Sequence, residues 1–151
     1  MIDLFHKHVL DQIGSSEIFH TKFFSESFTH SLYELFKEHK EWTTKRFAYS
    51  THDVHLEESF PDLFDLIKER FDNSILKVMA DVWALDQAVE TKDIFIVKYS
   101  KDTQTKLKMH VDDSYISGSI KLNNNYKGGI LTFPRPVSYT HLRAHETVLD
   151  L

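Results

Sequence analysis

The hydrophobic pattern of this chain changes its period near residue 92, and this change constrains the fold more than any other feature of the sequence. Upstream, apolar residues recur every three or four positions, which is typical of helices that bury one face. Downstream, β-branched and aromatic residues gather in short runs separated by Asn and Gly, which is typical of strands joined by turns. Helices that precede strands in one chain predict the α+β class, with the helices packed on an antiparallel sheet.

Two helices are predicted upstream of this change. The first follows Ser25, whose side chain can cap it, and runs to about Trp42. The second begins at Ser59, because Pro61 is tolerated in a first helical turn. The expected apolar faces are Phe28, Leu32, Leu35 and Phe36 in the first helix, and Leu63, Phe64, Ile67 and Phe71 in the second. Two weaker predictions complete this half of the chain: a helix over 2–13 and an extended segment over 17–24.

Three strands are predicted downstream, over 93–99, 114–122 and 129–133. The connections contain Asn and Gly, which tolerate the positive φ angles of tight turns. No stretch of the sequence is repetitive or has the composition of a linker, so a single domain is the simplest organisation.

The composition excludes several classes of function. There are 18 Lys and Arg residues against 23 Asp and Glu, and the formal net charge of -5 provides no basic field for nucleic acid or an anionic membrane. No apolar run is long enough for a bilayer span, and the first residues lack the apolar stretch of a secretory signal. The absence of cysteine excludes disulfides and thiolate metal sites and favours the cytoplasm. Any bound metal must therefore be held by His and carboxylate side chains.

The candidate metal-binding motif is the triplet His110-Val111-Asp112. Residues two apart in an extended backbone point to the same side, so the imidazole and the carboxylate can reach one metal ion. Two His and one carboxylate hold iron in non-haem Fe(II) oxygenases and leave positions open for a cosubstrate and O₂. By itself the triplet is weak evidence, because His-x-Asp is common in solvated loops. The neighbouring Asp113 is expected to face the other way.

A longer pattern surrounds this triplet. It consists of Phe95-Ile96-Val97-Lys98-Tyr99, then His110 and Asp112, then Leu122-Asn123, and then Tyr126-x-Gly128-Gly129 with Phe133. With these residues the chain resembles the catalytic core of the 2-oxoglutarate and Fe(II)-dependent dioxygenases, closest to that of the procollagen lysyl hydroxylases and of the related prolyl 4-hydroxylases. The specific part of the resemblance covers residues 94–133, and a fainter similarity reaches back to Phe19.

The resemblance implies a set of site residues and cofactors. His110 and Asp112 would be iron ligands, and Tyr99 would form a wall of the 2-oxoglutarate pocket. One or two of Ser117, Ser119 and Lys121, which share a face of the expected strand, would line the same pocket. The cofactors would be Fe(II) and 2-oxoglutarate with O₂ as cosubstrate, and ascorbate is a further candidate.

The resemblance also implies a fold and an activity. The fold would be a set of amino-terminal helices followed by a double-stranded β-helix, or jelly roll, truncated at its carboxy-terminal end. The activity would be hydroxylation of a lysyl, prolyl or other side chain in a protein or peptide, with release of succinate and CO₂. The identity of the hydroxylated residue stays open.

The end of the chain has a different character. Residues 137–147 resemble a translated transposase sequencing adapter, so we interpret 137–151 as a non-native read-through tail and 1–136 as the amino-terminal part of a dioxygenase domain. On this interpretation the second His ligand and the Arg or Lys that binds 2-oxoglutarate lie past Pro136 in the natural protein, and the given chain is an inactive fragment. His141 and Arg143 belong to the tail and are assigned neither role.

Two alternative functions remain open. One is a non-catalytic binding domain that keeps the jelly-roll shape without a working iron site. The other is a metallohydrolase in which His and carboxylate ligands hold a metal that activates water. The Tyr99 and Tyr126-x-Gly128-Gly129 pattern is not required in a metallohydrolase, which makes that function less favoured. The intact His110-x-Asp112 triplet argues against a binding domain that has lost its iron site.

Overall fold

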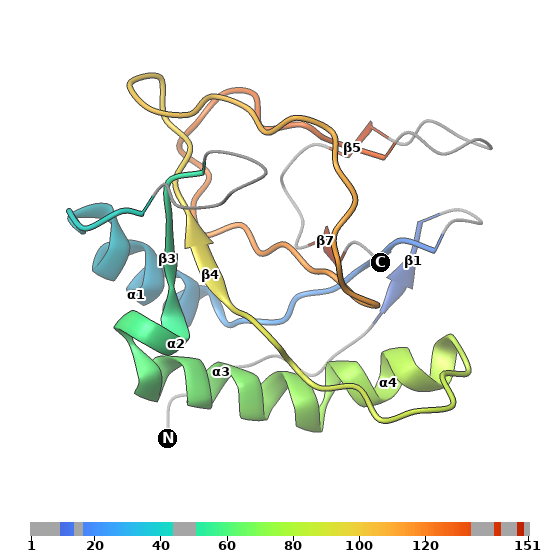
Figure 1. Ribbon diagram of the computed structural model, residues 1–151. Coiled ribbons are helices and arrows are strands. Elements are labelled where there is room, and N and C mark those ends of the chain that lie inside the picture. Colours follow the sequence, from blue (N-terminus) through green and yellow to red (C-terminus); the bar gives the residue numbers. More distant parts are fainter. Residues whose placement is uncertain (1–9, 14–16, 44–50, 134–140, 143–147, 150–151) are drawn as a thin grey trace. The chain divides into compact units, whose positions relative to one another are not determined.

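The computed structural model describes residues 10–13, 17–43, 51–133, 141–142 and 148–149. The chain divides into two compact units. Residues 39–108 form one, which we call the hairpin unit, and residues 1–38 together with 109–151 form the other, which we call the split unit. Both are built from helices and short paired strands (Figure 1).

The hairpin unit is organised around two antiparallel strands, β3 (Asp53–His55) and β4 (Phe95–Val97), which lie side by side in Figure 1. Val54 lies opposite Ile96 in this pairing. Backbone hydrogen bonds extend it at both ends, because Leu56 N donates to Ile94 O at 2.9 Å and Lys98 N donates to His52 O at 2.8 Å.

Three helices fill the chain between these strands: α2 (Leu56–Ser59), α3 (Pro61–Asn73) and α4 (Ile75–Val82). Pro61 occupies the first turn of α3, where its missing N–H costs no helical hydrogen bond. Only Ser74 separates α3 from α4, and its hydroxyl donates to the carbonyl of Arg70. The buried apolar residues of the unit come from β3 and from the three helices: Val54, Leu56, Phe64, Ile67, Ile75 and Met79.

Among its described residues, the split unit contains one helix and several two-residue strands. These are β1 (Asp11–Gln12), β2 (Phe19–His20), α1 (Glu26–Lys37), β5 (Leu131–Thr132), β6 (His141–Leu142) and β7 (Val148–Leu149). One antiparallel sheet has the order β1-β2-β7, and β5 pairs antiparallel with β6. Because β6 and β7 lie within residues 137–151, the interpretation of that segment as a tail stays a prediction.

Helix α1 follows its sequence signals closely. Ser25 is its N-cap, and the Ser25 hydroxyl accepts a hydrogen bond from Phe28 N at 3.2 Å. One face of the helix buries Phe28, Leu32 and Phe36. The ring of Phe28 meets the ring of Phe24 edge to face, with centroids 4.9 Å apart, which joins the helix to the chain that precedes it.

Several predicted boundaries are wrong. Helix α1 ends at Lys37 and not near Trp42: Glu38 is the C-cap, its N–H donates to Phe36 O, and Trp42 Nε1 donates to His39 O at 2.7 Å past the helix. Leu35 is 47% exposed and lies off the buried face. Asp11–Gln12 is a strand, whereas the sequence predicted a helix over 2–13; residues 2–9 of that prediction lie outside the described part of the chain.

The second predicted helix corresponds to α3, but two differences surround it. Helix α3 starts at Pro61, two residues after the predicted Ser59, and Leu56–Ser59 forms the separate short helix α2. Helix α4 was not predicted at all. Of the expected apolar face, Phe64 and Ile67 are buried, whereas Leu63 and Phe71 are half-buried.

The predicted strand over 114–122 does not form: these residues contain no strand. The Ser114 and Ser117 hydroxyls are 2.7 Å apart and hydrogen-bonded, which stabilises a bend where the strand was expected. The period-two argument that placed Ser117, Ser119 and Lys121 on one strand face therefore loses its basis. Strands do form at the other two predicted places, as β4 and β5.

The strands of the described residues form pairs and one three-stranded sheet, and none of them closes into a barrel. The jelly roll thus stays a prediction. Within the same residues, no helix combines the length and the hydropathy that a bilayer crossing requires.

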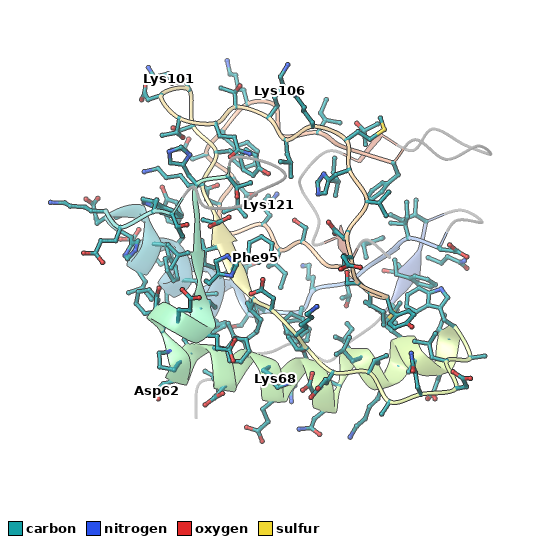
Figure 2. The ribbon with its side chains drawn as sticks, in the orientation of Figure 1. Asp62, Lys68, Phe95, Lys101, Lys106 and Lys121 are labelled. Atoms are coloured by element: carbon teal, nitrogen blue, oxygen red, sulfur yellow. The ribbon has the colours of Figure 1, made fainter. Side chains whose placement is uncertain are left out.

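A polar cluster attaches α3 to the chain that returns toward β4. Lys68, labelled in Figure 2, contacts Asp72 Oδ2 at 2.9 Å and donates to the Thr91 carbonyl at 2.9 Å. Asp72 Oδ1 accepts from both Thr91 N, at 2.8 Å, and Thr91 Oγ1, at 2.7 Å. Burial by itself would raise the pKa of Asp72, but the hydrogen bonds from Lys68 and Thr91 outweigh it and hold that pKa below its usual value.

The cap of α1 yields a first prediction. Ser25→Ala removes the acceptor for Phe28 N, so we expect the free energy of unfolding to fall by about 1 kcal/mol. Ser31→Ala, at an exposed position inside the same helix, should leave stability unchanged or slightly raised, because Ala is the better helix former. Urea unfolding of both variants checks this; equal losses would contradict the capping role.

The Asp72 cluster yields a second prediction. Because the folded-state pKa of Asp72 is lowered, its contribution to stability is present above the unfolded pKa of about 3.9 and is lost as the pH falls through the folded value. Asp72→Asn should therefore cost roughly 1.5–3 kcal/mol at pH 7, the range for hydrogen bonds to charged groups, and progressively less below about pH 4.

Asp65→Asn is the matched control for this substitution, since Asp65 is an exposed carboxylate on the same helix. It should change stability by less than about 0.5 kcal/mol at either pH. Urea unfolding at pH 7 and near pH 3.5 makes the comparison. An Asp72→Asn deficit that is constant with pH would contradict the role assigned to the carboxylate.

Candidate metal site

His110 and Asp112 lie against each other in the split unit. His110 Nε2 is 3.2 Å from Asp112 Oδ1, and the two side chains are 24% and 47% exposed. Their neighbours point into solvent, since Met109 is 74% and Val111 is 90% exposed. Residues 109–112 contain no strand, so the closeness of His110 and Asp112 is a local side-chain contact and not the result of alternation along a strand.

The separation of these two atoms suits a common metal ion. Donors bound at about 2.1 Å and roughly at right angles to each other lie about 3 Å apart, which is close to the observed contact. A neutral imidazole nitrogen and an ionised carboxylate oxygen are also donors that Fe(II) accepts. The same separation is that of a direct imidazole–carboxylate contact, so the role of the pair as metal ligands stays a prediction.

The described part of the chain does not bring a complete ligand set to this pair. Across the described residues, no group of three or more His, Cys, Asp or Glu side chains is arranged to hold a metal ion. Asp113, which follows the pair directly, is exposed. His110 and Asp112 therefore form an incomplete coordination set within this part of the chain.

Tyr99 follows β4 by two residues and is 50% exposed. It belongs to the hairpin unit, whereas His110 and Asp112 belong to the split unit. Its role as a wall of a cosubstrate pocket accordingly remains a prediction from the resemblance.

The Tyr126-x-Gly128-Gly129 motif forms a turn that requires its glycines. Gly128 has a φ angle of +91° and Gly129 one of +67°, values that residues with a side chain rarely adopt. A Cβ atom placed on Gly129 would lie 2.8 Å from Tyr126 Cε2, whereas one on Gly128 would meet nothing within 4 Å. Burial raises the pKa of the Tyr126 phenol. The second glycine therefore serves both the turn and the packing of the tyrosine ring.

Sequence reasoning missed a second His and carboxylate cluster, at the edge of β3. His55 Nδ1 is 3.1 Å from Asp93 Oδ1, and His55 Nε2 is 3.8 Å from Asp53 Oδ1. Asp53 is only 1% exposed, and its other carboxylate oxygen accepts from the Thr51 hydroxyl. The ring of His55 also packs on Phe95 of β4, with centroids 5.6 Å apart.

The geometry of this cluster favours a structural role over metal binding. The two ring nitrogens of His55 face two different carboxylates, so one ion cannot replace both contacts. The imidazole instead joins β3 to the segment that enters β4. The signal available in the sequence was the Asp53-x-His55 spacing, which matches the spacing of His110 and Asp112, but Asp93 could not be inferred because it lies 38 residues away.

Comparisons with known proteins add no assignment: no family model, no curated protein and no solved structure matches this chain.

The glycine turn yields a third prediction. Gly129→Ala should destabilise the protein by about 1–2 kcal/mol from the left-handed φ alone, and by more because of the contact with Tyr126. Gly128→Ala introduces the same unfavourable φ angle but no clash with a neighbouring side chain. It should therefore lower the free energy of unfolding by less than Gly129→Ala does. Thermal or urea unfolding of the two variants checks the order; a larger loss for Gly128→Ala would contradict this geometry.

Proposed function

We propose that this chain is the amino-terminal part of a 2-oxoglutarate and Fe(II)-dependent dioxygenase that hydroxylates a side chain of a protein or peptide. The single observation that carries the proposal is the 3.2 Å approach of His110 Nε2 to Asp112 Oδ1 on one side of the chain. The surrounding pattern from Phe95 to Phe133, which resembles the lysyl and prolyl hydroxylases, supports the choice of iron over other metals.

The residues of the chain would have separate roles. His110, as neutral imidazole, and Asp112, as carboxylate, would hold the ion at adjacent positions and leave the remaining positions to further ligands. Tyr99 would form a wall of the pocket for 2-oxoglutarate. Fe(II) with 2-oxoglutarate and O₂ supplies the oxidising chemistry: one oxygen atom enters the hydroxylated product and the other enters succinate, with loss of CO₂.

The turn at Tyr126 has a supporting role in this proposal. Gly128 and Gly129 adopt left-handed φ angles just before β5, and the Tyr126 ring packs over the second glycine. No phosphate-binding motif surrounds these glycines in the sequence, so a structural role in the turn accounts for them better than a nucleotide site does.

The proposal predicts turnover that depends on Asp112. The native full-length protein, with its natural continuation after Pro136, should release succinate when Fe(II) and 2-oxoglutarate are added. Asp112→Ala should abolish this release, because one of the proposed ligands is removed. Asp113→Ala, at the exposed neighbouring carboxylate, is the matched control and should retain activity.

Three outcomes separate the open alternatives. Succinate release at an unchanged rate in Asp112→Ala would refute the assigned ligand. A native protein that releases no succinate and binds no iron would be the non-catalytic binding domain. Metal-dependent hydrolysis without consumption of 2-oxoglutarate would indicate a metallohydrolase.

A further inference from the structure

Two buried nitrogen atoms of the hairpin unit, Gln104 Nε2 and His52 Nδ1, have no hydrogen-bond partner among the described residues. Such atoms are rare in folded proteins, because a buried polar group without a partner costs free energy. The two residues are in direct contact, since His52 N donates to Gln104 Oε1 at 3.3 Å in place of a carbonyl of the opposite strand. Both nitrogen atoms therefore belong to the same end of β3.

The contact with His52 fixes the orientation of the Gln104 amide. A backbone N–H can only donate, so the atom of the amide that accepts from it is the oxygen. The NH₂ group of the same amide is left with two hydrogen atoms to donate and has no capacity to accept. The group that satisfies Gln104 Nε2 must therefore be an acceptor.

Lys98 brings a positive charge to the same end of the strand pair. It continues the antiparallel pairing opposite His52, because Lys98 N donates to His52 O at 2.8 Å. Opposite residues of an antiparallel pair project their side chains from the same face of the sheet. The Lys98 Nζ atom lies 5.4 Å from the centre of the Trp42 ring, and this cation–π contact restrains the ammonium group.

The segment that contains Lys98 and Gln104 is basic, although the whole chain has a formal charge of -5. Residues 98–108 include four lysines and a single acidic residue, Asp102. Lys101 and Lys106, both labelled in Figure 2, are exposed. The local charge of this segment therefore attracts anions.

We propose that this end of the hairpin unit binds a small oxyanion, a carboxylate or a phosphate, through Gln104 Nε2, His52 Nδ1 and Lys98 Nζ. The amide NH₂ and the ammonium group can only donate, and the imidazole nitrogen donates in the tautomer that places its hydrogen on Nδ1. An anionic oxygen supplies the missing acceptor and forms charge-assisted hydrogen bonds with such donors. All three residues are half-buried, so the site lies close to the surface of the unit. The inference does not depend on the proposed function.

The test titrates the isotopically labelled 151-residue chain with inorganic phosphate and, separately, with acetate, at constant ionic strength. The readouts are the NMR signals of the Gln104 side-chain NH₂ and of the His52 imidazole. Gln104→Glu is the decisive variant, because it keeps an oxygen that accepts from His52 N and replaces the donor nitrogen by a second oxygen. Lys98→Met removes the proposed ammonium donor, and Lys101→Met, at an exposed position of the same basic segment, is its matched control.

We expect both signals of the parent chain to shift and saturate. Gln104→Glu should weaken binding at least about tenfold, because a donor is replaced by a negative charge. Lys98→Met should weaken binding about 3- to 10-fold, and Lys101→Met should stay within about twofold of the parent. The hydrogen exchange of the His52 amide should not change in Gln104→Glu, which separates loss of the site from loss of local structure. Tighter binding of phosphate would assign the site to phosphate groups, and tighter binding of acetate would assign it to carboxylates.

Two results would overturn the inference. One is a parent chain in which neither anion shifts the Gln104 and His52 signals, which would leave water as the partner of the two nitrogen atoms. The other is a Gln104→Glu variant that binds as tightly as the parent. If this variant loses the protection of the His52 amide, the lysine variants decide: equal affinities of Lys98→Met and Lys101→Met would refute the site.

Discussion

The pairing of β3 with β4 is the contact on which the hairpin unit depends. It joins residues 52–56 to 94–98 and so encloses α2, α3 and α4 in one long connection. Closing such a loop costs chain entropy, although the cost grows only slowly with loop length. Apolar burial along α3 and α4 offsets this cost, and the Asp72–Thr91 hydrogen bonds attach the end of the connection to α3.

Side-chain contacts at both ends of β3 define the limits of this pairing. At one end of β3, His55 links the strand to Asp93 just before β4, and at the other end Gln104 replaces the missing strand partner of His52. These contacts set where β4 begins and ends. Tyr99 follows directly from that end, so its local position depends on a backbone pairing.

The sequence correctly predicted the features that depend on residues close together in the chain. The Ser25 cap and the buried positions Phe28, Leu32 and Phe36 follow from residue type and side-chain spacing along one helix. The left-handed φ angles at Gly128 and Gly129 were likewise expected from residue type.

Predictions failed where local preferences competed or where partners are distant. The segment 114–122 combines strand-forming residues with serines, and the Ser114–Ser117 hydrogen bond favours a bend. The end of α1 depends on the contact between Trp42 and His39, which no helical period encodes. Gln104 could not be identified from spacing, because its partner His52 is brought near only by the strand pairing.

The central claim is that the imidazole of His110 coordinates a metal ion together with Asp112. Pulsed electron paramagnetic resonance of the Mn²⁺-loaded chain tests it directly, since a coordinated imidazole nitrogen modulates the electron spin echo. The account predicts a nitrogen modulation in the parent chain that disappears in His110→Ala and persists in His55→Ala. A modulation that survives the His110 substitution, or that is lost only with His55, would contradict it.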